Sequence, residues 1–527
     1  MIYLVNITAL PPGSTTPQVL RFCAGVPGFR TGPSDTPANA IWIPQLGVPY
    51  HISRTMFGGN DAGGSQVGDG TIELNNDGTL DLYDFQDWAF DGQPVEVFAG
   101  TDGQTYAQFQ RVFKGVIQAV EHQWDTMVIH ICDRQQQLNL PIPGLPKYLG
   151  TNSGSTGIEG LSTDIMGKFK PVALGNCKNV TPVLVNTSVN IYQVHYRQVQ
   201  DIPAVYMAAV SITKGADYAN ETLLAAATIA GGTYATCLAK GLFRINAALG
   251  QQVTADVLGD AVGGYVNNCA DILGRLLTLQ GWSAGTDYDA TSLATLKASN
   301  SAEMGIYDTN GASVLSLMDQ ACAGPWAWFC PNRQGVTIFG RVQAPSGSPV
   351  ATFTDSLMMD LARISNDITN INVNSGSNAT TGNPWSLVTL NYGQNYTVMS
   401  GAQIAGAVAT TQVNWLAQQF RQATSTTSGQ PDATVLARHP LAEQVTATTP
   451  FVAQSDATAE AQRRAAFRSA TRRAFQFKVD PAQANSVDIG STVALTSARF
   501  GLAASLFTVT ALNEQTDQQY VEVTVNG

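Results

Sequence analysis

The sequence predicts a fold that is mainly β with α+β portions, in which β-barrel or sandwich-like domains flank a mixed middle region. Short segments that alternate polar and apolar residues recur towards both ends of the chain, separated by clusters of Gly, Pro, Asn and Asp. This pattern is typical of half-buried strands joined by tight turns. Helical spacing of apolar residues is concentrated between them. The length of 527 residues exceeds what one hydrophobic core supports and predicts about two to four domains.

The positions of these signals divide the chain into expected domains. They are an N-terminal β-rich domain over residues 1–143, a mixed middle domain over 144–262, an α+β domain over 263–345, and a C-terminal β-rich domain with one basic helix over 346–527. Pro141, Pro143 and Pro146 mark the first boundary, because proline is excluded from helix interiors and from central strands.

The N-terminal domain is expected to consist of strands at hairpin spacing. Glycine is too frequent in Gly58–Gly64 for regular structure, and Asn75–Gly78 is a strong tight-turn signal. The expected strands are Ile2–Val5, Ile41–Ile43, Thr71–Leu74, Pro94–Phe98, Val112–Ile117 and Met127–Ile131.

Helices are expected mainly in the two middle domains. Asn220 is a plausible N-cap for a helix over Glu221–Ala230, and the leucines of Tyr265–Gln280 have amphipathic helical spacing. Further helices are expected within Asp289–Ser299 and Ser313–Ala323, followed by a hairpin of Trp326–Phe329 and Val336–Phe339. Strands are expected at Val183–Val185 and Tyr192–Tyr196.

The C-terminal domain returns to strands around one basic helix, expected over Ala457–Phe475. The expected strands are Asn370–Asn374, Leu387–Tyr392, Val493–Leu495, Phe507–Thr510 and Tyr520–Val525. On the helix, Arg464, Arg468 and Arg472 recur every four residues and would share one face. They are candidates for contact with an acidic partner subunit; the alternatives are a solvated helix face and nucleic acid.

The composition narrows the classes of function. Charged residues make up only 13% of the chain, and the formal net charge of −11 argues against stable binding to nucleic acid. The N-terminus lacks the basic and apolar regions of a signal peptide, and no stretch is apolar enough for membrane insertion. The seven cysteines include no CxxC pair, so we expect buried thiols and folding in a reducing cytoplasm.

The motifs of common enzyme classes are missing from the sequence. No glycine loop precedes a Lys-Ser/Thr pair, no Gly-x-Ser-x-Gly occurs, and the five histidines form no metal-ligand motif. We therefore expect no catalytic residues, no cofactor and no metal. A dispersed carboxylate pair stays open, because the acidic, aromatic-interleaved run around Asp81, Asp84, Asp87 and Asp91 suits either sugar binding or a solvated loop.

Several segments of the sequence resemble tail proteins of siphophages and prophages of Gram-negative bacteria. They are Thr71–Asp81, Trp88–Val95, Val112–Gly115, Cys132–Arg134, Pro141–Gly150 and Lys170–Pro182. The end is similar to tail-hub proteins more broadly, with a helix near residue 460, then Val487–Leu495 and two strands. Gly490-Ser491 stands where these proteins usually have Gly-Asp, a departure from the pattern.

The resemblance implies an assembly role without chemistry. Hub proteins of this kind are built from tube-like β domains and form rings, often homotrimers, around the tape measure and the DNA path. They hold fibres or a spike at the tail tip or baseplate. The chain is thus expected in the virion, after assembly in the host cytoplasm. The alternatives are a sixfold distal-tail ring, a tail-associated cell-wall hydrolase and a receptor-binding protein.

Overall fold

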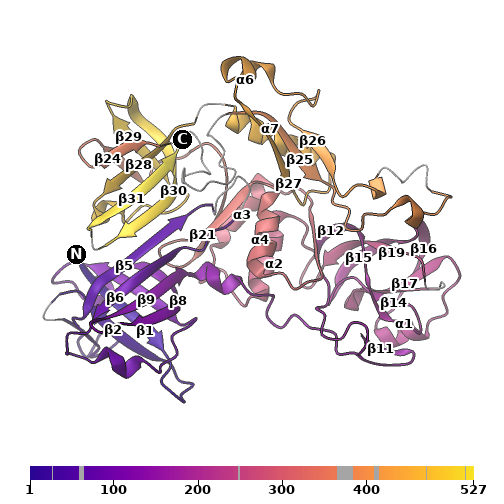
Figure 1. The fold of residues 1–527 in the computed structure, drawn as a ribbon, viewed down its shortest axis with the longest axis horizontal. Helices are drawn as coiled ribbons and strands as arrows, with labels where there is room; N and C mark the ends of the chain where they lie inside the picture. Colours follow the sequence, from indigo (N-terminus) through magenta and orange to yellow (C-terminus); the bar gives the residue numbers. More distant parts are fainter. Residues whose placement is uncertain are drawn as a thin grey trace.

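The computed structural model describes residues 1–25, 28–57, 64–246, 250–364, 384–408, 415–469, 472–516 and 518–527. It confirms the mainly β fold: the larger elements are several sheets, with a small group of helices near the centre of the molecule (Figure 1). Among the described residues, none of the helices has the length and apolar character needed to span a membrane.

One sheet of 13 strands joins the two ends of the chain. Its main path is β2-β1-β7-β8-β9-β6-β5-β30-β31-β28-β24, and β23 and β29 branch from β30. The N-terminal strands are β1 (Ile2–Ala9), β2 (Gln18–Cys23), β5 (Leu46–Thr55), β6 (Asp69–Asn75), β7 (Pro94–Gly100), β8 (Gln110–His122) and β9 (Thr126–Asp133). The C-terminal strands are β23 (Ala351–Thr354), β24 (Met359–Arg363), β28 (Ala474–Val479), β29 (Thr492–Ser497), β30 (Leu502–Gln515) and β31 (Tyr520–Asn526).

The alternation of side chains along these strands produces two hydrophobic cores. In β7, for example, Val95, Val97 and Ala99 are buried while the residues between them are more exposed. Because successive side chains of a strand point to opposite faces, such strands cover a core on one side only. The N-terminal strands enclose one core cluster and the C-terminal strands a second. A short pair, β3 (Phe29–Arg30) and β4 (Ile41–Trp42), lies beside the first.

The middle of the chain forms a separate sheet of nine strands, drawn on the right of Figure 1. Its strands are β12 (Val172–Val180), β13 (Val183–Asn186), β14 (Ile191–Gln193), β15 (Val199–Met207), β16 (Val210–Asp217), β17 (Thr233–Cys237), β18 (Leu242–Ile245), β19 (Val253–Asp260) and β20 (Gly305–Asp308). The hairpin β10 (Thr151–Ser153) and β11 (Thr156–Leu161) precedes it. The strand predicted at Val183–Val185 is confirmed. Of the strand predicted at Tyr192–Tyr196, only Tyr192 and Gln193 lie in a strand, because β14 ends at Gln193.

The predicted helices of the middle domains are present, each with a capping side chain at its start. Asn220 accepts a hydrogen bond from the backbone N–H of Leu223, as predicted, although α1 ends at Ala226 and is shorter than expected. The helices are α1 (Glu221–Ala226), α2 (Cys269–Leu279), α3 (Ala290–Ser299) and α4 (Val314–Ala323). The predicted hairpin is β21 (Ala327–Pro331) and β22 (Thr337–Arg341).

The basic helix of the C-terminal domain has different bounds from those predicted. Helix α7 covers Gln454–Arg468, and residues 474–479 form β28. The prediction of a helix to Phe475 is wrong because Arg473 exchanges backbone hydrogen bonds with Gly527, which places the next residues beside β31. Helix α7 packs on a small sheet of β25 (Trp385–Tyr392), β26 (Arg421–Thr424) and β27 (Glu443–Thr448). The short helices α6 (Ala433–Arg438) and α8 (Pro481–Ala484) complete this part.

Short 3-10 helices connect several strands: η1 (Leu82–Phe85), η2 (Tyr106–Gln108), η3 (Arg134–Leu138), η4 (Leu238–Lys240) and η5 (Gly401–Gln403). The strand predicted at Asn370–Asn374 and most of the predicted Gly58–Gly64 loop lie outside the described residues. The four-domain division at residues 143, 262 and 345 stays a proposal.

Candidate functional site: a charged junction between the ends of the chain

The ends of the chain meet where strand β5 pairs with strand β30. His51–Thr55 lies antiparallel to Ala511–Gln515, so the N-terminal and C-terminal halves of the large sheet share one hydrogen-bond ladder. Strand β30 pairs with β29 through its first half and with β5 through its second half, while β31 covers its other edge. Its length of 14 residues is what allows it to join both halves.

A buried group of charges lies on this joint. Nη2 of Arg54 is 2.9 Å from Oε1 of Glu514, and Nη1 of Arg54 is 3.0 Å from Oδ1 of Asp488. Nε of Arg333 is 3.1 Å from the same Oε1, and the Tyr50 hydroxyl donates to the other carboxylate oxygen. The side chains of Arg54 and Glu514 are only 2% and 3% exposed. Residues from β5 and from the β21–β22 turn therefore meet at the Glu514 carboxylate of β30, and Arg54 links this carboxylate to Asp488 in the segment before β29.

The electrostatics keep Glu514 and Arg54 charged. Burial raises the pKa of Glu514, but Arg333 and Arg54 outweigh it and hold that pKa below its usual range. Burial lowers the pKa of Arg54, and its acidic neighbours Asp488 and Glu514 more than reverse this. Removing one partner from such a group leaves an uncompensated buried charge, which is costly. The junction thus joins the two halves of the sheet through buried ion pairs.

The turn of the β21–β22 hairpin is held between the two halves of the sheet. The backbone N–H of Arg333 donates to Asp488 at 2.7 Å, and Arg54 donates to the carbonyl oxygen of Pro331 at 3.0 Å. On the other side, Arg111 donates to the carbonyl oxygen of Gln334 at 3.0 Å, and the Gln334 amide donates back to the Arg111 carbonyl at 2.8 Å. The hairpin thereby connects the helical region to both halves.

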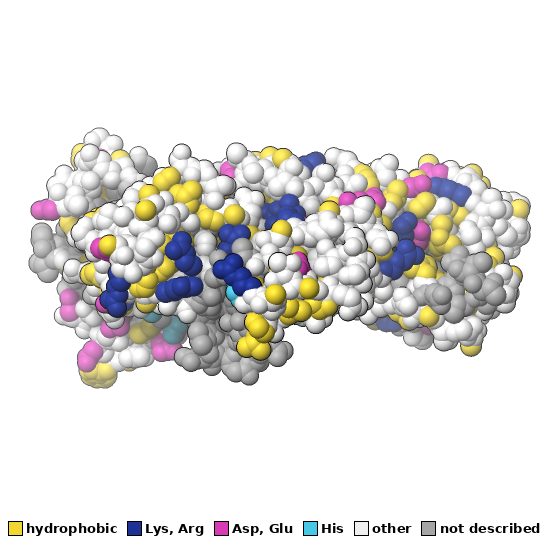
Figure 2. All heavy atoms as spheres, turned by 90° about the horizontal axis from the view of Figure 1, so that it is seen from above, with side chains coloured by type: hydrophobic (Ala, Val, Ile, Leu, Met, Phe, Trp, Pro, Cys, Tyr) yellow, Lys and Arg dark blue, Asp and Glu magenta, His cyan; other side chains and the backbone are white. Residues whose placement is uncertain are grey.

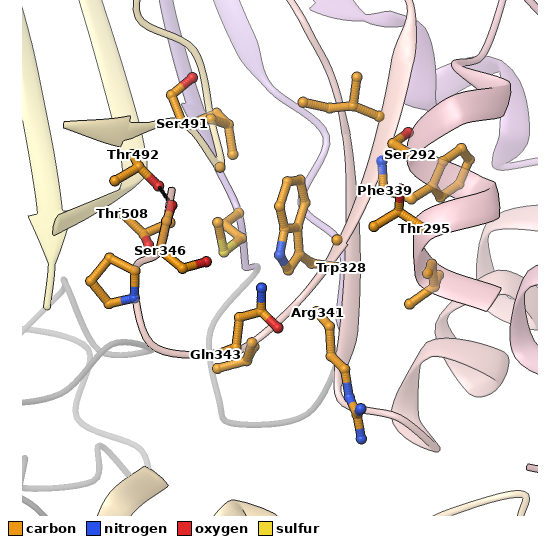
Figure 3. A pocket seen from close by; sticks show the side chains of 18 of the residues that line it. Ser292, Thr295, Trp328, Phe339, Arg341, Gln343, Ser346, Ser491, Thr492 and Thr508 are labelled. Atoms are coloured by element: carbon orange, nitrogen blue, oxygen red, sulfur yellow. Dashed lines mark hydrogen bonds between the residues drawn. The ribbon is translucent and has the colours of Figure 1, made fainter. Parts of the chain in front are cut away.

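A cleft of about 380 Å³ opens beside the junction, between the hairpin, helix α3 and strand β29 (Figure 3). Trp328 forms one wall, and hydroxyl side chains of Ser292, Thr295, Ser491 and Thr492 lie around the opening. Thr492 donates to the carbonyl oxygen of Ser346 at 2.9 Å. The described residues that line the cleft include no Asp, Glu, His, Cys or Lys. They therefore provide no general acid or base.

Two glycines make room for the Trp328 ring. A Cβ atom on Gly340 or on Gly490 would lie 2.3 Å from an atom of the indole. Gly490 also has a φ of +80°, a backbone conformation that glycine adopts most easily. The residues of the segment Val487–Leu495 therefore have structural roles. Asp488 joins the charged group, Gly490 faces the indole, and Ser491 borders the cleft.

The three arginines expected on one helix face have two kinds of environment. Arg464 is buried on α7, with Nε 2.9 Å from Oε1 of Glu460 and Nη2 bonded to the carbonyl oxygens at 323 and 324. Arg468 is 3% exposed and stacks over the Trp385 ring, which itself stacks on the Trp326 ring beneath Arg464. Arg464 and Arg468 thus share a helix face, but it is the buried face of α7. Arg472 does not belong to it, because it lies beyond the end of the helix, over the Phe467 ring; the partner contact stays a prediction.

Glu460, which sequence reasoning did not single out, anchors this helix. It is 1% exposed and accepts from Arg341, Arg463 and Arg464. Burial raises its pKa, but the three guanidinium groups more than compensate and lower it to about 2. Sequence reasoning also missed the junction residues. Their signal is one charged residue in a strand whose other residues carry no charge at neutral pH, as at Arg54 and Glu514, because such a charge must find a partner once buried.

The acidic run lies in an exposed loop between β6 and β7. Asp81 caps the 3-10 helix η1, and Asp84, Asp87 and Asp91 are also exposed. In the described parts of the chain, no three His, Cys, Asp or Glu side chains come close enough to hold a metal. All seven cysteines are buried free thiols, as predicted.

Comparisons with known proteins find similarity in structure only. No protein-family model matches the sequence, and no curated protein matches it. The fold is similar to a tail protein from Neisseria meningitidis, with 10% identity, a TM-score of 0.42, and coverage of 100% of this chain and 96% of that one. It is also similar to the 43 kDa tail protein of prophage MuSo2 from Shewanella oneidensis, with 9% identity, a TM-score of 0.41, and coverage of 100% of this chain and 96% of that one. Prophage tail protein gp18 from Listeria monocytogenes matches with 8% identity, a TM-score of 0.38, and coverage of 100% of this chain and 94% of that one.

Each of these matches extends over the whole of this chain. Their identities of about a tenth transfer no residue role to this chain.

Proposed function

We propose that this chain is a structural virion protein of a phage tail, the hub of the tail tip or baseplate. In this role it joins the tail tube to fibres or a spike and surrounds the DNA exit path, without chemistry of its own. Its partners would be the tube or distal-tail protein, the tape measure, and further copies of itself in a ring, with a homotrimer expected. Assembly in the host cytoplasm would precede incorporation at the tail tip.

The observation that carries the proposal is the single sheet shared by the two ends of the chain. A hub must hold its wall segments in a fixed relation while other proteins attach to both sides. Here β5 and β30 join two sheet halves with separate cores, and the charged group around Glu514 fastens the joint. A ring of such units would also remove exposed sheet edges, which are a hazard in a free subunit.

The ring is tested by measuring the mass of the purified full-length protein by native mass spectrometry and by imaging the particles. A closed trimer with a central channel is the expected result. A hexamer would replace the hub by a distal-tail ring, and a monomer at all concentrations would contradict the homo-oligomer.

The absence of chemistry is tested separately by zymography on murein. No clearing is expected from the purified protein. Clearing that disappears in Asp84→Asn and Asp87→Asn variants would replace the structural role by that of a cell-wall hydrolase.

A further inference from the structure

The charges of the chain are divided unequally along its length. Residues 55–110 contain ten Asp and Glu and no Lys or Arg. Residues 461–479 contain six Lys and Arg and no Asp or Glu. Since the chain as a whole is acidic, the second stretch is a local exception. Where each stretch lies on the fold determines whether the two can meet within one copy.

The acidic stretch exposes a loop near one end of the large sheet. Asp77, Asp81, Asp84, Asp87 and Asp91 are all exposed and form no ion pair with another described residue. The loop is fixed in place, because Leu10 and Ala89 exchange backbone hydrogen bonds of 3.0 Å each way. Leu10 directly follows β1, and β1 lies next to the terminal strand β2. We call these five aspartates the acidic loop.

The basic stretch contributes two half-buried arginines to a patch near the opposite end of the same sheet. Arg472 and Arg473 precede β28, which lies next to the terminal strand β24. Arg499 belongs to the same area, because it lies over Phe500, and the Phe500 ring contacts Phe475 of β28. Figure 2 shows several separate groups of Lys and Arg side chains on the left and in the centre of the face seen from above, and others on the right. We call these three arginines the basic patch.

The basic patch has no acidic partner among the described residues. Arg472, Arg473 and Arg499 lie over aromatic rings, at 4.2 Å, 5.8 Å and 5.9 Å from the ring centres. None of them forms an ion pair within the described parts of the chain. Burial and the nearby Arg468 lower the pKa of Arg472, which is what a cation without an acidic neighbour undergoes.

We propose that the acidic loop of one copy docks on the basic patch of the next copy, head to tail. The labels of β1 and β2 lie at the lower end of the large sheet in Figure 1, and β24 lies at the upper end. Two different surfaces at opposite ends of one body make a heterologous contact, which closes into a ring when the rotation between copies allows it. Arginine suits this contact because its guanidinium can bind a carboxylate through two hydrogen bonds.

The inference rests on the proposed ring and specifies its chemistry. Complementary charges at the rim of an interface speed association and fix its orientation. Since exposed charges are screened over about 10 Å at 0.1 M salt, the contact is expected to weaken as salt is added. The proposed occupant of the basic patch is therefore a second copy of this chain. If the patch instead binds a different acidic protein, the test below will show that the copies do not assemble through it.

The test reverses the charges on each side of the contact in the full-length protein. Arg472→Glu with Arg473→Glu, and separately Asp84→Lys with Asp87→Lys, are compared with the wild type by sedimentation at about 0.05 M and about 0.5 M salt. Each double variant is expected to weaken assembly by about tenfold or more. All four substitutions in one chain restore opposite charges across the contact and are expected to restore assembly.

Controls separate this contact from folding and from net charge. Lys147→Glu with Lys168→Glu makes the same change in net charge as the arginine double variant, at two exposed positions away from the large sheet, and is expected to leave assembly unchanged. Thermal unfolding checks that each variant folds, and Arg499→Glu is a second variant if Arg473→Glu does not fold. Folded double variants that assemble like the wild type, or a fourfold variant that stays dissociated, would overturn the inference while leaving the ring intact. A wild type that is monomeric throughout would overturn the ring itself.

Discussion

Arg54 and Glu514 form an ion pair of 2.9 Å although 460 residues separate them in the chain. One lies on β5 and the other on β30, the two strands that join the halves of the large sheet. Both side chains are almost completely buried, so the pair exists only when the two ends of the protein have come together. The pair is therefore a direct indicator of the intact junction.

Glu514→Gln is expected to lower the free energy of unfolding by about 3 to 5 kcal/mol, because Arg54 and Arg333 would keep their buried charges without a full partner. Urea unfolding followed by fluorescence measures the change. Asp102→Asn, at an exposed position in the N-terminal half of the same sheet, is the control and is expected to change little. Equal stability of the two variants would show that the charged group does not fasten the junction.

Gly490→Ala is expected to destabilise the protein by about 2 kcal/mol or more, because the new Cβ would collide with the Trp328 indole. The matched control is Gly78→Ala. Gly78 has a similar φ of +85° but no atom within 4 Å of the new Cβ, so only the backbone cost of about 1 kcal/mol is expected. Thermal denaturation of both variants measures the difference, and identical losses would contradict a collision with Trp328.

Asp133 and Asp319 are expected to make the protein more stable as the pH falls from 7 to 5. Burial raises the pKa of each from 3.8 to about 6, against the hydrogen bonds that they accept from Gly68, Gln135 and Ser65. A carboxyl whose folded pKa is raised contributes stability that is complete below its unfolded pKa and is lost as the pH rises through about 6.

Together the two carboxyls should add about 2 kcal/mol to the free energy of unfolding as the pH falls from 7 to 5. His195 opposes this, because burial lowers the pKa of its imidazole from 6.5 to about 3, so it stays neutral in the folded protein while the unfolded chain binds a proton in this range. The carboxyl contribution is therefore measured as a difference: in urea unfolding at several pH values, Asp319→Asn is expected to gain about 1 kcal/mol less than the wild type between pH 7 and pH 5. The same pH dependence in both proteins would contradict the raised pKa of Asp319.

The cysteines are expected to be unreactive in the folded protein. All seven are buried, and burial raises the pKa of the Cys177 thiol to about 12 and of the Cys237 thiol to about 11. Since the thiolate is the reactive form, alkylation at pH 8 should label no cysteine before unfolding and all seven in denaturant. Mass spectrometry counts the labels, and rapid labelling of the native protein would contradict the buried positions.

The sequence by itself determined the local elements and the class of fold. Asn220 and the alternating residues of Pro94–Phe98 act through neighbours a few positions away, so their effect can be read without the fold. The absence of common catalytic motifs could also be read directly from the sequence.

The tertiary structure decided which distant segments meet. Residues 469–479 lie in a basic, Ala-containing stretch that resembles the helix before it, yet Ala474–Val479 is a strand because it pairs with β31. Arg464 was expected at the surface and lies inside, since Glu460 and the carbonyl oxygens of another segment satisfy its charge. The joint of β5 with β30 depends on contacts across most of the chain, and periodicity within a short window carries no information about such partners.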